Sequence, residues 1–305
     1  MDDSVLNFSP PIMQSSSLIP DELLYEIFSR LPSRAVARCR CLSKFWASML
    51  RRQDFIHSFW TKSSARPRIL FAYQDDSKFI FFSSPQPENP EENSYVVAAN
   101  RLACFPRSYG FFGCTSGFLG YGAKRIFDLT ESGKNPVYVP VICNPNTGQS
   151  LTLPRLKSRK RFGLESYLGY EPIAKQLKVL SMEISLVSMK HKVLTLGTQK
   201  LSWRLVECSI PHSPSRKWIC ISGVLYYAAS VNSYSLNCMV VCFDLRTEKF
   251  TVINFMETFN RALPGSTNMV NYGGKLGFLM SGDSHDVTRA STSFELCCFF
   301  PSVLV

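Results

Sequence analysis

The sequence lacks both a long apolar run and a secretory leader. No segment reaches the ~18 consecutive apolar residues that a membrane-spanning helix requires. The chain opens with Met1, Asp2 and Asp3, whereas a leader begins with a basic patch followed by an apolar stretch. We therefore expect a protein without membrane contact that resides in the cytoplasm, the nucleus or both.

Histidine is scarce, and none of it stands in a catalytic motif. The four histidines, at positions 57, 191, 212 and 285, lie outside Gly-x-Ser-x-Gly, His-Glu-x-x-His and zinc-ligand patterns. Gly273-Gly274-Lys275 is similar to part of a phosphate-binding loop, but Leu276 stands where that loop needs Ser or Thr. We interpret this segment as a hairpin turn, and we expect no enzymatic activity and no cofactor.

Cysteine is present, but not in the arrangement of a disulfide framework or a zinc site. The eleven cysteines are an odd number in a chain without a secretory leader. Cys39/Cys41 and Cys297/Cys298 are close pairs, yet zinc sites use pairs separated by two to four residues, with a second matching pair. We predict free thiols that pack as small apolar side chains, and no metal site.

The excess of positive charge is concentrated in the middle of the chain. The formal net charge is +11, and residues 61–219 contain 22 of the basic and 11 of the acidic residues. The densest basic run consists of Arg155, Lys157, Arg159, Lys160 and Arg161. Such a run can bind nucleic acid or an acidic protein surface, and it can equally be a solvated loop. Phe162 and Tyr167 nearby are too few to indicate a base-stacking surface.

The first 62 residues predict a short lead-in followed by a small helical module. Residues 1–17 are polar and contain Pro and Ser, which predicts disorder. Residues 18–62 have the apolar spacing of three or four short helices. In the first of these, Leu23, Ile27 and Leu31 recur at i, i+4 and i+8, in a helix that Pro20 opens and Pro32 ends.

Polar residues mark the starts of the later helices. Ser33 is placed to cap the second helix and Asp54 to cap a final turn, and we expect the third helix to begin at Ser43. A module of about 45 residues is too small to hold itself together with much margin. We therefore expect part of its apolar surface to be covered by a partner.

Residues 63–305 change to short β-rich runs separated by Gly, Pro, Asn and Asp. Pro85–Asn93 has the composition of a surface loop. The predicted strands are Arg68–Tyr73, Phe79–Phe82, Val137–Cys143, Val193–Leu196, Val240–Phe243 and Phe250–Ile253.

Turn signals in this region recur with a nearly constant period. Gly148, Gly197 and Arg246 are each 49 residues apart, and Gly117, Gly223 and Gly274 are separated by 106 and 51 residues. Repeats of ~40–50 residues made of several short strands are typical of propeller blades, whereas chance spacing of common turn residues is the alternative. We predict a multidomain protein, with a small all-α module followed by a larger, mostly-β domain that is β-propeller-like, with a kelch-like period and either a complete or an incomplete set of blades.

Several segments carry a recognisable pattern. The stretches Ile19–Pro32 and Arg38–Trp46 resemble the F-box motif of plant F-box proteins. Downstream segments resemble the F-box-associated domain; they are Cys143–Gln149, Leu153-Pro154, Leu168–Pro172, Lys178–Leu180, Ser202–Arg204, Gly223–Tyr227 and Cys242–Phe250. After Glu295-Leu296, where the family usually continues with an acidic, Trp-containing segment, this chain has Cys297-Cys298-Phe299-Phe300. That departure predicts an altered last strand and an exposed sheet edge.

The resemblance implies a substrate-recognition subunit of an SCF-type E3 ubiquitin ligase. Its F-box would bind a Skp-type adaptor, and through it cullin, while its β domain would bind a target protein through residues that stay unassigned. The residues that the resemblance assigns to the adaptor interface or to the small core supporting it are Pro20, Leu23, Leu24, Ile27, Leu31, Pro32, Leu42 and Trp46. Of these, we expect Leu42 and Ile27 to lie partly in the core.

Two other interpretations remain at this point. One is a nucleic-acid-binding protein that uses the basic region 155–161. The other is a shortened F-box protein without a functional target site.

Overall fold

The computed structural model describes residues 19–64, 68–75, 78–85, 100–106, 109–125, 137–145, 149–157, 164–184, 188–230, 238–254, 267–281 and 294–298. The predicted lead-in at 1–17 and nearly all of the predicted loop at Pro85–Asn93 lie outside these residues. The chain divides into two compact units, one containing residues 1–71 with 82–101 and the other containing residues 72–81 with 102–305. No helix in the described part of the chain is long and apolar enough to span a membrane.

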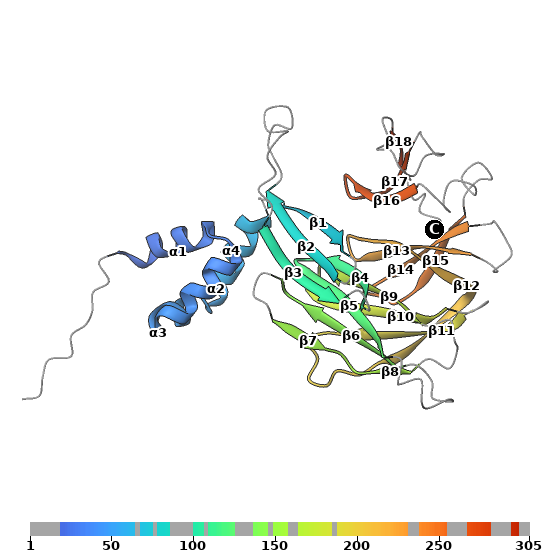
Figure 1. Cartoon of the computed structure of the whole chain (residues 1–305), viewed down its shortest axis with the longest axis horizontal. Coiled ribbons are helices and arrows are strands. Elements are labelled where there is room, and N and C mark those ends of the chain that lie inside the picture. Colours follow the sequence, from blue (N-terminus) through green and yellow to red (C-terminus); the bar gives the residue numbers. More distant parts are fainter. Residues whose placement is uncertain are drawn as a thin grey trace, which may run out of the picture. The chain divides into compact units, whose positions relative to one another are not determined.

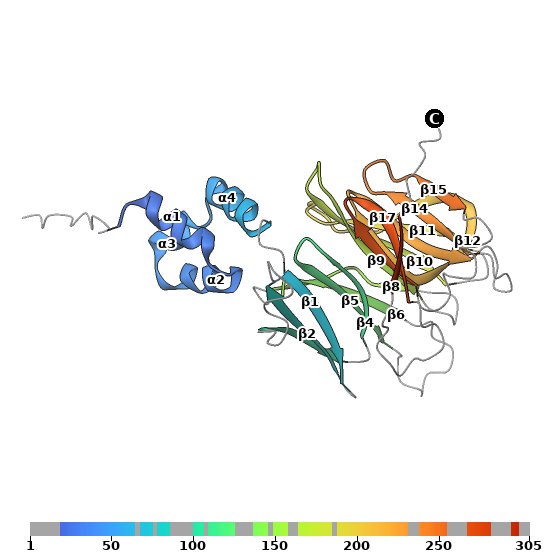
Figure 2. The same cartoon turned by 90° about the horizontal axis from the view of Figure 1, so that it is seen from above.

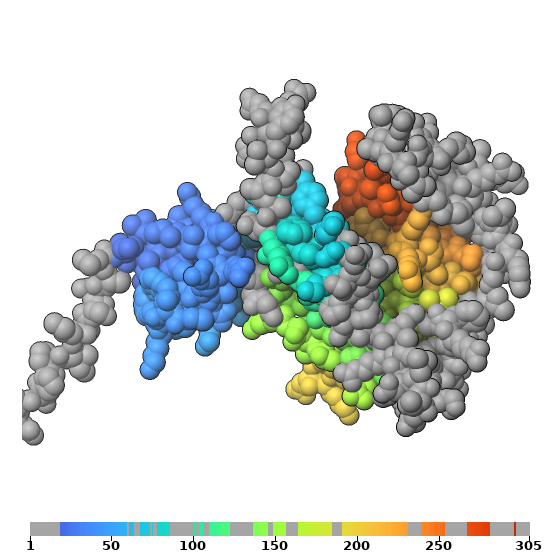
Figure 3. All heavy atoms as spheres, viewed as in Figure 1, coloured from blue at the N-terminus to red at the C-terminus, as the bar shows by residue number. Residues whose placement is uncertain are grey.

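Four helices form the N-terminal module, which appears as a blue body in the space-filling view (Figure 1 and Figure 3). They are α1 (Asp21–Arg30), α2 (Ser33–Leu42), α3 (Lys44–Met49) and α4 (Gln53–Ser64). The third helix starts where expected, with Ser43 as its N-cap residue, whose side chain accepts a hydrogen bond from the Phe45 N–H.

Two predicted helix starts differ from the observed ones. Pro32, rather than Ser33, precedes α2, because the Pro32 carbonyl already accepts hydrogen bonds from the N–H groups of Ala35 and Val36. Asp54 does not open a single final turn but lies in the first turn of a 12-residue helix. The expected module end at residue 62 falls inside α4, whose last residue is Ser64, and the first strand starts at Arg68.

The helical module has a small core of its own, to which all four helices contribute. Two ring contacts brace it, with centroids 5.1 Å apart for Phe28 and Trp46 and 5.6 Å apart for Tyr25 and Phe55. The buried apolar side chains are Leu24, Phe28, Val36, Met49, Leu50 and Phe55.

Eighteen strands follow in the described residues, arranged in four sheets (Figure 1 and Figure 2). The first sheet contains β1 (Arg68–Gln74), β2 (Lys78–Pro85) and β3 (Asn100–Pro106). The second contains β4 (Tyr109–Thr115), β5 (Phe118–Arg125), β6 (Val137–Cys143) and β7 (Ser150–Thr152), with β8 (Leu156–Lys157) also paired to β6. The third contains β9 (Leu164–Glu171), β10 (Gln176–Glu183), β11 (Ser188–Thr195), β12 (Arg204–Ile221), β13 (Val224–Ser230), β14 (Cys238–Asp244) and β15 (Phe250–Asn254). The fourth contains β16 (Thr267–Tyr272), β17 (Lys275–Ser281) and β18 (Phe294–Cys298).

The seven-stranded sheet is two four-stranded units that share the long strand β12. The first half of β12 pairs with β11 from Arg204 to His212, and the second half pairs with β13 from Ser213 to Ile221. The first strands of successive units are neighbours: β4 contacts β9, β9 contacts β12, and β12 contacts β16. Inner strands that meet in succession are what a propeller-like arrangement produces.

The recurring turn signals mark equivalent places in successive units. Ser116-Gly117, Ser222-Gly223 and Gly273-Gly274 each have positive φ at both positions, from 49° to 85°, which is the signature of a two-residue type I′ hairpin turn. Each connects the first strand of a unit to the second. The intervening unit turns instead through residues 172–175, where the Glu171 carboxylate accepts the N–H groups of Ile173 and Ala174. Because this turn contains no glycine, Gly117 and Gly223 are separated by two periods.

The second set of recurring turn signals lies between the third and fourth strands of successive units. Gly197 lies between β11 and β12, and Arg246 between β14 and β15, while Gly148 lies outside the described residues. β18 pairs with β17 from Phe294 to Cys298. The expectation of an altered C-terminal edge concerns residues beyond Cys298, which lie outside the described part.

Replacing Gly223 with Ala is expected to destabilise the β domain by about 1 kcal/mol or more. Gly223 has φ +85°, and an added Cβ would come 3.0 Å from the Pro172 Cδ. The matched control is Gly110→Ala in β4, where the nearest atom to an added Cβ is 4.0 Å away. Urea denaturation should show a lower midpoint for the first variant only, and equal midpoints for both would contradict this view of the turn.

Candidate functional site on the helical module

The α1 helix has a buried face and, beside it, an exposed one. Leu24 and Phe28 are 6% and 3% exposed and belong to the core of the module. Leu23 and Ile27, one position earlier in each case, are 55% and 49% exposed. Because Leu23 and Ile27 are four residues apart, they lie on one side of the helix, and we call this pair the α1 ridge.

The structure divides the eight predicted interface residues into three groups. Leu24 is a core residue that supports the helix from within, which is the second of the two roles expected for these residues. Leu31 and Trp46 are partly buried against the same core. The residues with exposed side chains are Pro20, Leu23, Ile27, Pro32 and Leu42.

The expectation that Leu42 and Ile27 lie partly in the core was wrong for Leu42. This side chain is 73% exposed, because it is the last residue of α2 and no later turn of that helix covers it. Ile27 is half-exposed and is not part of the core cluster. Helical spacing shows which residues share an apolar stripe, but a broad stripe contains both residues that pack in the core and residues that stay exposed.

Two further exposed apolar side chains belong to the same module and were not predicted. Ile19 and Phe45 are 43% and 47% exposed. Phe45 is three residues after Leu42 and follows the Ser43 cap, a position that could have identified it as the neighbour of an exposed helix end. Ile19 precedes Pro20 and lies within the F-box-like stretch.

An ion-pair network fixes the outer side of α1 to α4. The Glu26 carboxylate is paired with Arg30 four residues later and with Lys62 of α4. Hydrogen bonds from Lys62 and Arg30 lower the pKa of Glu26 from its ordinary value of 4.5. The network holds the helix in register without covering Leu23 or Ile27, which leaves the α1 ridge available.

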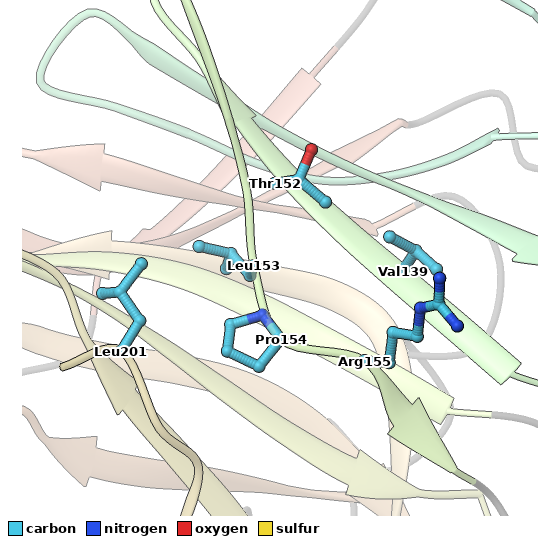
Figure 4. A pocket seen from close by; sticks show the side chains of 6 residues that line it. All are labelled: Val139, Thr152, Leu153, Pro154, Arg155 and Leu201. Carbon is cyan, nitrogen blue, oxygen red and sulfur yellow. The ribbon is translucent and has the colours of Figure 1, made fainter.

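A pocket in the β domain is lined by apolar side chains, by the hydroxyl-bearing Thr152 and by the cation Arg155 (Figure 4). Its volume is about 420 Å³. Leu201 lies on one side and Val139 and Arg155 on the other, with Leu153 and Pro154 between them. Trp203 supports this wall by donating its indole N–H to the Pro154 carbonyl at 2.7 Å. Such a site can accept an apolar side chain beside a carboxylate.

The basic run, one candidate for nucleic-acid binding, is only partly described by the structure. Within it, only residues 155–157 lie in the described part of the chain, and Phe162 does not. Tyr167 is fully buried and stacks on Tyr227 with ring centroids 4.9 Å apart. Tyr167 is therefore a core residue and cannot stack on a base.

Metal-ligating residue types meet at a place that chain spacing did not indicate. His191, Cys208 and His212 are buried, and their possible ligand atoms all lie within 4.8 Å of one another. Cys39 is half-buried and Cys41 is exposed on α2, so both remain free thiols. His57 is exposed on α4, and His285 lies outside the described residues.

Comparison with known proteins agrees with the two-part architecture. Residues 16–58 match the F-box domain, and residues 68–298 match the F-box associated beta propeller domain. The second match covers most of the chain and identifies the β-rich part as propeller-like. A solved structure of RS223-Beta-xylosidase aligns at TM-score 0.33 and 10% identity over 70% of this chain and 85% of that chain, a similarity too low to support any argument.

Curated relatives from Arabidopsis thaliana match over nearly the whole chain. F-box protein DOR is 49% identical over 263 residues, which are 86% of this chain and 66% of that protein. Putative F-box protein At3g23960 is 45% identical and F-box protein At5g65850 is 43% identical, with 91% and 94% of this chain covered and 70% and 69% of those proteins. The chain thus spans about two thirds of the length of these relatives. It belongs to the family of F-box proteins that carry an F-box associated beta propeller domain, and it is homologous to the plant members of that family.

Proposed function

We propose that this chain is the substrate-recognition subunit of an SCF-type E3 ubiquitin ligase. In this role the helical module binds a Skp-type adaptor, which binds cullin, and the β domain binds the protein to be modified. The chain itself contributes recognition rather than catalysis.

The observation that carries this proposal is the exposed α1 ridge on a module whose core is already complete without it. Leu23 and Ile27 leave about half of their surface in water, although six other apolar side chains fill the interior. Covering that remaining surface contributes about 1 kcal/mol for each side chain. Exposed apolar side chains grouped on one helix face are typical of a helix that docks into a groove of another protein.

The β domain supplies a separate surface for the target. Its pocket between Leu201 and Arg155 belongs to a rigid sheet scaffold, on which binding residues are commonly presented by loops. We propose that the target contacts this domain, because the exposed apolar residues of the helical module are committed to the adaptor.

The two roles are expected to separate when the chain is cut between α4 and β1. A chain ending at Ser64 should still capture the Skp-type adaptor, since the module core lies entirely within residues 24–55. A chain starting at residue 65 should not capture it. Pull-down of purified adaptor measures both outcomes, and adaptor capture by the second chain would contradict the assignment.

The target is sought with the full chain under proteasome inhibition. Proteins that accumulate with the full chain, and are absent with the chain ending at Ser64, are candidates for direct binding tests. Equal recovery of the same proteins by both chains would place the target contact on the helical module instead.

A further inference from the structure

Three nitrogen and sulfur donors meet inside the β domain, and none of them lines the pocket described above. His191 lies on β11, and Cys208 and His212 lie on β12. They are 0%, 4% and 0% exposed, and one ligand atom from each lies within 4.8 Å of the others. The rings of His191 and His212 have centroids 5.1 Å apart.

An irregular stretch of β12 brings these residues together. Lys190 pairs with Glu207, and Ser188 pairs with His212, so two steps along β11 correspond to five along β12. The extra residues bulge out between Cys208 and His212 and place both side chains beside His191. Bulges re-aim side chains in this way.

The surroundings of His212 match those of a metal-ligating histidine. Its Nδ1 is 2.8 Å from the Ile210 carbonyl oxygen, so this nitrogen carries the proton and donates it. The other nitrogen, Nε2, is then unprotonated, and its lone pair accepts a hydrogen bond from the Tyr227 hydroxyl at 2.7 Å. Metal-bound histidines commonly donate their second ring N–H to a backbone carbonyl, which fixes the tautomer and the ring orientation.

We propose that His191, Cys208 and His212 form a buried binding site for a zinc ion. Two imidazoles and one thiolate are a donor set that zinc accepts readily, with a fourth tetrahedral position for an oxygen ligand. The Tyr227 hydroxyl lies next to His212, and its hydrogen bond to Nε2 has to break before the lone pair of that nitrogen can bind the metal. This proposal stands independently of the adaptor function.

Binding requires a modest contraction of the cluster. Ligand atoms bound to one zinc ion at about 2.0–2.3 Å are roughly 3.3–3.8 Å apart. The observed limit of 4.8 Å therefore closes by about 1 Å, through side-chain rotation of His191 or Cys208. The Cys208 thiol loses its proton to solvent on binding and exchanges its contact with the Ile210 carbonyl, now 3.4 Å away, for the metal.

The ion would connect the two four-stranded units that share β12. His191 also contacts the Phe250 ring of β15 at 5.0 Å between centroids, and Tyr227 belongs to β13. A metal at this place would hold the bulge of β12 against both units. Its removal should lower the thermal stability of the β domain and leave adaptor binding unchanged.

The test uses the full chain, purified alone under reducing conditions. After dialysis against a weak chelator, metal analysis should find about one zinc per chain. In metal-depleted protein, added cobalt(II) should give the absorption band of thiolate-to-cobalt charge transfer. Cys208→Ser should abolish that band, whereas Cys242→Ser, which changes a buried cysteine of β14 outside the cluster, should retain it.

A second measurement needs no variant and therefore does not depend on how well Cys208→Ser folds. A strong chelator should lower the melting temperature of the wild-type chain, and stoichiometric zinc should restore it. Absence of zinc together with an unchanged melting temperature would overturn the proposal, and the cluster would then be a polar contact held by Ile210 and Tyr227. A cobalt band that persists in Cys208→Ser would overturn it as well.

Discussion

Ile27→Asp is expected to abolish binding of the Skp-type adaptor while the helical module stays folded. Ile27 is 49% exposed, so a carboxylate at this position remains in water in the free chain. In the complex the same carboxylate would be buried without a partner, which costs several kcal/mol. We expect affinity to fall by at least about 30-fold, the effect of losing a central interface residue. Isothermal titration calorimetry, in which the adaptor is titrated into the chain, measures this affinity.

Leu24→Asp should behave differently, although it lies on the same helix. Leu24 is 6% exposed and packs in the module core, so a charge there should unfold the module rather than only block a surface. Circular dichroism should show loss of helix for Leu24→Asp and none for Ile27→Asp. Leu151→Asp is the matched control, since this leucine of β7 is 42% exposed but lies on the β domain. Full adaptor affinity in Ile27→Asp would remove the α1 ridge from the interface.

Lys178→Met is expected to destabilise the β domain by about 3 kcal/mol, the cost of breaking a buried ion pair. The Lys178 ammonium donates to the Leu245 carbonyl at 2.6 Å and to a Glu248 carboxylate oxygen at 2.7 Å. Its side chain is 9% exposed and that of Glu248 is 14% exposed. Methionine keeps the apolar part of the side chain but leaves the Leu245 carbonyl oxygen without the hydrogen bond from Lys178. Because Arg204 still pairs with Glu248, we expect a loss near the lower end of the ~3–5 kcal/mol that breaking a buried ion pair costs.

Thermal denaturation should show this loss as a melting temperature lower by roughly 6–12 °C for a domain of this size. Lys249→Ala is the control, because Lys249 is an exposed lysine next to Glu248 in the sequence. A Lys178→Met chain as stable as the wild type would mean that this ion pair adds nothing to the packing of β10 against the β14–β15 turn.

The same ion pair predicts a dependence on pH. Burial raises the pKa of Glu248, but hydrogen bonds from Arg204 and Lys178 outweigh burial and lower the pKa from 4.5. The unfolded chain therefore binds this proton more readily, so the carboxylate adds stability above pH 4.5. That addition is lost as the pH falls through the lowered value, and the difference between wild type and Lys178→Met should shrink over the same window.

Local patterns predicted the elements of this protein well. Apolar runs bounded by turn residues placed the strand Val137–Cys143 at its observed ends, and Ser43 was identified as the start of the third helix. The recurrence of Gly117, Gly223 and Gly274 predicted the repeat because a type I′ turn needs positive φ at fixed positions. These features depend on neighbours in the chain, which is why the sequence alone reveals them.

Features that depend on distant residues were not predictable in the same way. Leu23 and Leu24 are adjacent and equally apolar, and only the packing of Phe28, Met49 and Phe55 decides which of them is covered. The pairing of Lys178 with Glu248 joins residues 70 positions apart. The bulge that brings Cys208 and His212 beside His191 has no counterpart in the spacing of the sequence.

The most direct test of the account is whether the wild-type chain binds a Skp-type adaptor through α1. Hydrogen–deuterium exchange of the chain with and without adaptor should show protection concentrated in residues 19–31 and 42–46, with the strands from β4 onward unchanged. Saturating adaptor that leaves exchange in α1 unaltered would contradict the proposal that a separate polypeptide covers Leu23 and Ile27.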